Sequence, residues 1–168
     1  GGLVTNCLIG SNSAGQIKGG GIYVGGGTLV DSVVSHNYQT DPTWGPGGGV
    51  YLNAGSVLNC RIQNNEVRGG GLGGYGVGAG GGAMIRGGLM LNCRITGNRA
   101  TYSLDANGDG GGVYITGGSL VNCTVASNSC NGARTGGGVY KTGGVVTNTI
   151  VFGNKQGSGD QNIYSSGT

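Results

Sequence analysis

The feature that most constrains the fold is a repeated pattern of glycine and asparagine. Twelve residues after the start of each glycine triplet comes an Asn or Asp, and six residues further comes an Asn. The triplets begin at Gly19, Gly47, Gly80, Gly110 and Gly136. Each repeat is a block of 19 residues followed by a spacer of 7 to 14 residues. A period of 26 to 33 residues predicts a solenoid, in which each repeat buries its apolar face against its neighbours.

The repeats divide one domain into about six coils, which begin near residues 1, 19, 47, 80, 110 and 136, with a partial last coil over 160–168. Apolar residues at alternate positions after each triplet predict a short strand, because side chains of a strand alternate between its faces. A second apolar stretch predicts a strand that bends at the Asn. We therefore expect an all-β, right-handed parallel β-helix, with the handedness that parallel crossovers generally have. Variable loops are expected at one corner, in the spacers 13–18, 38–46, 66–79, 99–109 and 129–135.

Asparagine and a small residue, most often cysteine, recur side by side in the second strand. Aligned amides can hydrogen-bond from coil to coil, so the first position predicts an asparagine ladder inside the stack. The second position predicts a column of small buried thiols. The predicted structural ladder consists of Asn6, Asn59, Asn92, Asn122, Asn148, Cys7, Cys60, Cys93 and Cys123. The other asparagine series, from Asn12 to Asn154, is predicted to mark the next turn.

The cysteines leave a second interpretation open. A disulfide between neighbouring coils, Cys60 with Cys93 or Cys93 with Cys123, is compatible with the expected rise per coil. Cys130 is predicted to lie in a spacer, where it could bond to a partner molecule.

Aromatic residues recur at the outward position of the first strand. Stacking of their rings for stability is one interpretation, and sugar binding by exposed ring faces is the other. The candidate ligand face consists of Tyr23, Tyr51, Tyr114, Tyr140 and, in a spacer, Trp44.

Composition excludes several classes of protein and of partner. Glycine accounts for 44 residues, but without a Gly-X-Y period the chain is not collagen-like. Only 9% of residues are charged, and the Lys and Arg behind the net charge of +3 are scattered, so we expect no nucleic-acid partner. No apolar run approaches the roughly 18 residues that would span a membrane, so we expect no membrane insertion. The low charge and the Asn, Ser, Thr and Gly content are typical of an extracellular or cell-surface protein.

Residue types that carry out chemistry are sparse. The C-x₂-C spacing of metal sites is absent. Asp105 and Asp109 share a spacer and could form a carboxylate pair, although solvated loop acids or weak calcium ligands fit equally well. The lone His36 is predicted at a surface turn. We therefore expect no catalytic residues, no metal, no cofactor and no enzymatic activity.

Two kinds of block carry a resemblance to a known family. Gly-Gly-Gly-Val-Tyr occurs at 47–51, 110–114 and 136–140, and Asn-Cys-x-Ile-x-x-Asn occurs at 59–65 and 92–98. This layout resembles bacterial right-handed parallel β-helix repeat proteins, in particular polymorphic outer-membrane proteins and autotransporter adhesins. The chain departs from them in having Val or Ile where that family has Phe. The resemblance implies a β-helix and a surface location. Pectate-lyase-type enzymes share the asparagine ladder, but their catalytic residues have no counterpart here.

The two ends of the sequence match complementary halves of one coil. Residues 1–6 match 143–148, and residues 162–168 match 138–144. An open solenoid end exposes core and unpaired strand edges, so we expect copies of the chain to stack head to tail as a structural filament. The predicted interface consists of Gly1, Gly2, Leu3, Val4, Asn162, Ile163 and Tyr164. The alternatives are a passenger fragment of a surface adhesin that binds glycans or host surface proteins, and a polysaccharide lyase or hydrolase.

Overall fold

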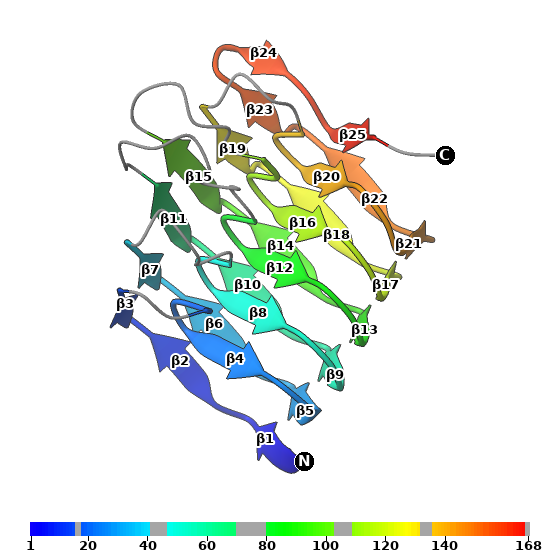
Figure 1. The fold of residues 1–168 in the computed structure, drawn as a ribbon. Coiled ribbons are helices and arrows are strands. Elements are labelled where there is room, and N and C mark those ends of the chain that lie inside the picture. The colour runs from blue at the N-terminus through cyan, green and yellow to red at the C-terminus, as the bar shows by residue number, and fades with distance from the viewer. Residues whose placement is uncertain (16–17, 41–46, 70–79, 103–108, 132–135, 167–168) are drawn as a thin grey trace.

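The computed structural model describes residues 1–15, 18–40, 47–69, 80–102, 109–131 and 136–166. Within these ranges the regular elements are β-strands, and strands of successive repeats stack into four sheets (Figure 1). Three sheets hold six strands and one holds seven, so the chain makes about five full turns. The predicted all-β parallel β-solenoid is confirmed, with a number of coils close to the predicted six. Its right-handed sense stays a prediction. No helix in these ranges is long and apolar enough to cross a membrane.

Each complete coil contributes one strand to each sheet. Sheet A consists of β1 (Gly2–Thr5), β5 (Gly27–Val30), β9 (Ser56–Leu58), β13 (Leu89–Leu91), β17 (Ser119–Val121) and β21 (Val145–Thr147). Sheet B consists of β2 (Leu8–Gly10), β6 (Val33–Ser35), β10 (Arg61–Gln63), β14 (Arg94–Thr96), β18 (Thr124–Ala126) and β22 (Ile150–Phe152).

Sheets C and D complete the circuit. Sheet C consists of β3 (Ser13–Ala14), β7 (Tyr38–Gln39), β11 (Glu66–Gly69), β15 (Arg99–Tyr102), β19 (Ser129–Cys130), β23 (Lys155–Gln156) and β24 (Gly159–Asp160). Sheet D consists of β4 (Ile22–Val24), β8 (Val50–Leu52), β12 (Ala83–Ile85), β16 (Val113–Ile115), β20 (Val139–Lys141) and β25 (Ile163–Ser165).

The register of every parallel pair follows the sequence repeat. In sheet A, Met90 pairs with Val57 on one side and with Leu120 on the other. In sheet B, Ile62 pairs in the same way with Val34 and Ile95. These inward side chains form one continuous core with the apolar residues of sheet D. The core therefore runs along the whole stack, as the alternation of apolar positions predicts.

The bend between sheets A and B is made by a residue with a left-handed backbone. The backbone angle φ lies between 47° and 54° at Asn6, Asp31, Asn59, Asn92, Asn122 and Asn148. Asn and Asp tolerate this conformation better than other residues with a side chain. The predicted bend at this position is confirmed.

The spacers were predicted to be loops, but they are not loops throughout. Each begins with a sheet C strand, such as Arg99–Tyr102 in the spacer 99–109. The remainder of each spacer lies, in sequence, between a sheet C strand and the next sheet D strand. Parts of these connections, at 16–17, 41–46, 70–79, 103–108 and 132–135, lie outside the described residues.

A small second core lies behind sheet C. Val67, Ala100 and Cys130 are buried against one another at equivalent positions of successive strands. Cys130 was predicted to be in a spacer loop and accessible to a partner, and this is wrong, because its strand faces it inward.

Candidate functional site

The buried asparagine ladder runs through the series that follows the second bend. Asn37, Asn65, Asn98, Asn128 and Asn154 are almost completely buried. In each coil the Asn side-chain oxygen accepts two hydrogen bonds from the Asn of the preceding coil. For Asn98 these come from the backbone N–H and the amide Nδ2 of Asn65, at 2.9 and 3.0 Å.

The same amide also donates two hydrogen bonds. Nδ2 of Asn98 reaches the backbone carbonyl of Ile62 at 2.9 Å and Oδ1 of Asn128 at 3.0 Å. An asparagine side chain has two donor hydrogens and an oxygen that accepts two bonds, so this arrangement satisfies it completely. A buried column of amides is stable only under that condition, since each unpaired polar group would cost free energy.

The ladder was predicted at the other asparagine series, and this is wrong. The residues predicted for it, Asn6, Asn59, Asn92, Asn122 and Asn148, are exposed at the bend between sheets A and B. A residue in the left-handed conformation at this corner points its side chain out of the coil. A short surface series of hydrogen bonds remains there, from Asn92 to Asn59 at 3.3 Å and from Asn59 to Asp31 at 3.1 Å.

The cysteine column lies in the interior, as predicted, over three of its four members. Cys60, Cys93 and Cys123 are buried free thiols, whereas Cys7 in the first coil is an exposed free thiol. The backbone N–H of Cys93 donates to Sγ of Cys123 at 3.3 Å. Hydrogen bonding with the thiols of Cys123 and Cys60, together with burial, raises the pKa of the Cys93 thiol. The same hydrogen bonds with Cys93 lower the pKa of the Cys60 and Cys123 thiols, so it is the central thiol, Cys93, that is held protonated.

The tyrosine column follows the predicted outward position of sheet D, but most of its rings are covered. Tyr51, Tyr114 and Tyr140 form a buried cluster with Met84. Ring centroids lie 5.1 Å apart between Tyr114 and Tyr140, and also between Tyr140 and Tyr164. The prediction that Tyr51, Tyr114 and Tyr140 form an exposed ligand face is wrong, because burial leaves no ring face for a sugar.

The other two members of that predicted ligand face are Tyr23 and Trp44. Tyr23 is 50% exposed at the first strand of sheet D, with its ring stacked on Tyr51 at a centroid distance of 5.4 Å. Trp44 lies outside the described residues. Binding of glycans or host surface proteins stays a prediction.

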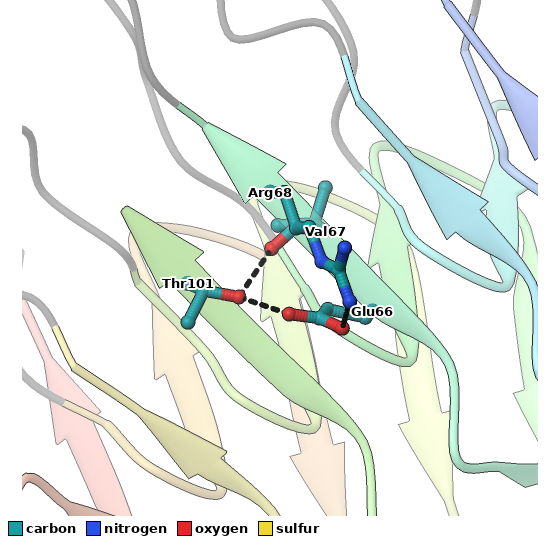
Figure 2. A network of polar contacts seen from close by, with 4 residues as sticks. All are labelled: Glu66, Val67, Arg68 and Thr101. Atoms are coloured by element: carbon teal, nitrogen blue, oxygen red, sulfur yellow. Dashed lines mark hydrogen bonds and ion pairs between the residues drawn. The ribbon is translucent and has the colours of Figure 1, made fainter. Parts of the chain in front are cut away.

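Charged side chains gather on the outer face of sheet C (Figure 2). Arg68 forms an ion pair with the Glu66 carboxylate at 2.8 Å, and the Thr101 hydroxyl donates to the same carboxylate. Partial burial opposes ionisation of Glu66, but Arg68, the Thr101 hydroxyl and the charge of Arg99 together lower the pKa of its carboxyl. The Arg68 guanidinium also lies over the Tyr38 ring, 5.0 Å from its centroid. The cluster links three successive coils, through Tyr38, the Glu66–Arg68 pair and Thr101.

The other acids that the structure describes and the histidine lie at different places on the solenoid. Asp31 and His36 are exposed at two different bends, Asp160 is exposed in β24, and Asp109 is buried beside the triplet at Gly110. The Asp105–Asp109 pair cannot be placed, because Asp105 lies outside the described residues. In the described part of the chain, no three His, Cys, Asp or Glu side chains are grouped so that they could hold a metal ion.

Large exposed apolar side chains concentrate at the two ends of the solenoid. They are Leu3, Val4, Leu8 and Tyr23 at one end, and Val145, Ile150, Phe152, Ile163 and Tyr164 at the other. The predicted interface residues Gly1, Gly2, Leu3, Val4, Ile163 and Tyr164 are all exposed. Asn162 is half-buried instead, and its side-chain oxygen accepts hydrogen bonds from Asn154.

Comparisons with protein-family models, with curated proteins and with solved structures found no match to this chain. The resemblance to polymorphic outer-membrane proteins and autotransporter adhesins therefore gains no support from them. What is shown is the parallel β-solenoid itself.

Proposed function

We propose that the chain is a non-enzymatic structural β-solenoid whose copies associate end to end into an extracellular filament. The observation that carries this proposal is the distribution of exposed apolar side chains. All nine large hydrophobic residues that are exposed among the described residues belong to the first or last strands of their stacks. Contiguous exposed apolar surface marks an interaction site in a soluble protein.

Unpaired strand edges accompany this apolar surface. The terminal strands β1, β2 and β4 at one end, and β21, β22 and β25 at the other, each have a partner on one side only. An exposed strand edge is a template for pairing with another strand. When the same two surfaces of every copy join head to tail, the product is an open polymer. Only 9% of the residues are charged, and this low overall charge supports a location outside the cell.

Sedimentation velocity over a range of protein concentrations tests the proposal. We expect the 16.4 kDa chain to sediment faster as its concentration rises. Ile150→Asp should abolish this dependence, because it places a charge in the apolar end strand β22. Thr124→Asp is the matched control, since Thr124 occupies the same outward position one coil earlier. Monomers at every concentration, or equal loss of association in both variants, would overturn the proposal.

A further inference from the structure

The C-terminal end of the solenoid is closed along one sheet and open along the others. After β23 the chain turns back, and β24 pairs with β23 in antiparallel orientation. This hairpin covers the edge of sheet C, where the next coil of a solenoid would add a parallel strand. Sheets A, B and D end instead with the parallel strands β21, β22 and β25.

Asn162 closes the asparagine ladder at the same place. Its Oδ1 accepts hydrogen bonds from the backbone N–H and from Nδ2 of Asn154, both at 3.1 Å. Asn154 receives the same two bonds from Asn128, both at 2.9 Å. Asn162 thus supplies the acceptor that the asparagine of a further coil would supply, although only eight residues separate it from Asn154. A further ladder asparagine has no place there.

The exposed apolar residues follow the same division. At both ends they belong to sheets A, B and D, and none of the exposed large hydrophobic residues that the structure describes belongs to sheet C. The closed sheet therefore presents a polar edge, whereas the open sheets present apolar ones.

From this division we infer which surfaces of two copies meet, an inference that rests on the proposed function. We propose that β1, β2 and β4 of a second copy extend sheets A, B and D by pairing with β21, β22 and β25, and that sheet C takes no part. If the second copy pairs in the same strand register as successive coils of one chain, Leu3 lies beside Val145, Leu8 beside Ile150 and Tyr23 beside Tyr164. Each pair belongs to one column of equivalent positions in the repeat.

The tyrosine contact continues packing that already exists inside the chain. Tyr23 of the second copy would stack on Tyr164 as Tyr164 stacks on Tyr140, at about 5 Å. Phe152 would lie beside Gly10, where the absence of a side chain leaves room for its ring. Because β24 occupies the place of β3, that two-residue strand of the second copy must be displaced.

Disulfide trapping tests this register. In a Cys7→Ser background, Leu8→Cys and Ile150→Cys proteins are mixed and treated with a mild oxidant. Neighbouring parallel strands hold Cα atoms about 4.8 Å apart, which is within the range of a disulfide. We expect a linked dimer in the mixture and none in either protein alone. Leu8→Cys mixed with Phe152→Cys is the register control, and Ser13→Cys mixed with Lys155→Cys is the sheet C control. Both controls should stay unlinked.

The outcomes separate the two proposals. Linking through Leu8 and Ile150 alone supports the three-sheet interface. Linking through Ser13 and Lys155 to the same extent would overturn it and leave end-to-end association standing, as would association without a Leu8–Ile150 link. A mixture that stays monomeric by sedimentation would overturn both proposals.

Discussion

At the scale of the residue, the ladder asparagine is the most constrained side chain of each coil. Its amide must accept two hydrogen bonds and donate two within a space that water does not reach. Aspartate would lose both donors and place like charges above one another, at a high cost in the interior. Only an amide of this length meets the requirement, which explains why the buried position is asparagine in every coil.

Removal of one ladder amide is expected to destabilise the fold strongly. Asn98→Gly leaves the backbone N–H and Nδ2 of Asn65 without their acceptor, and each buried unsatisfied group costs about 1–3 kcal/mol. We expect the free energy of unfolding in urea to fall by about 3–5 kcal/mol.

The matched control is Asn92→Gly, the same substitution at the exposed bend. Glycine adopts the left-handed backbone of Asn92 without strain, so the change should be within about 1 kcal/mol. Equal destabilisation by the two variants would contradict the assignment of the buried ladder.

Glu66 gives the stability a dependence on pH. Its pKa is lowered in the folded chain, so its stabilising contribution is present above the unfolded pKa of about 4.3 and is lost as the pH falls through the folded pKa. The melting temperature of the wild type should therefore exceed that of Glu66→Gln at pH 7, and the difference should shrink in strong acid. Thr101→Val should reduce the effect. A difference that stays constant from pH 7 to pH 2.5 would argue against this network.

At the scale of the element, the third glycine of each triplet makes room for the ladder. A Cβ added to Gly82 would lie 2.8 Å from Nδ2 of Asn98 and 2.8 Å from the backbone oxygen of Gly112. Real Cβ atoms do not approach other atoms so closely. The strand of sheet D and the ladder can therefore pack together only if this position is glycine.

Adding that single methyl group is expected to be costly. Gly82→Ala should lower the free energy of unfolding by about 1–3 kcal/mol, the usual cost of overpacking. Gly26→Ala provides the comparison, because a Cβ there meets nothing within 4 Å. Thermal unfolding of the two variants measures the difference, and no difference would contradict the packing described for the triplet.

The cysteine column predicts a simple pattern of reactivity. Thiol reagents attack the exposed thiolate form, so Cys7 should react in the folded protein while Cys60, Cys93, Cys123 and Cys130 stay protected. A colorimetric thiol assay should count one fast thiol per folded chain and five in denaturant. Cys7→Ser should remove the fast phase. A second fast thiol would show that the column or the sheet C core opens readily.

The sequence predicted the strands of sheets A, B and D, those of A and B as one strand that bends at the Asn, because their apolar positions keep fixed distances from the glycine triplet. It did not predict sheet C, whose strands begin spacers of variable length and are as short as two residues. A weak signal was present, since polar and buried residues alternate in Glu66-Val67-Arg68 and Arg99-Ala100-Thr101.

The two asparagine series could not be told apart by spacing alone, since both repeat in every coil. Only the backbone conformation decides which one points inward. Asp31 is the one residue that distinguishes the two series in the sequence. It belongs to the series predicted as buried, and a lone carboxylate does not fit inside an amide column. The covering of the tyrosine rings depends on tertiary packing, which no repeat pattern reveals.

At the scale of the whole molecule, the solenoid is stabilised by contacts between neighbouring coils only. An internal coil has a neighbour on both sides, whereas the first and last coils have one. Val4 in the first coil is 37% exposed, whereas Leu29 at the equivalent position of the next coil is 1% exposed, and this difference measures what an end coil lacks. A second copy would supply this contact, and the molecule would then be stabilised by its own assembly.

The central claim is therefore that copies of this chain join end to end and continue the stack. Cryo-electron microscopy of the concentrated protein tests it most directly. Six strands in each of sheets A, B and D at a spacing of about 4.8 Å predict filaments in which the subunit repeats about every 29 Å along the axis. Density for continuous sheets A, B and D across each junction would support the account. Separate particles of one chain, or filaments whose subunits meet through their sides, would contradict it.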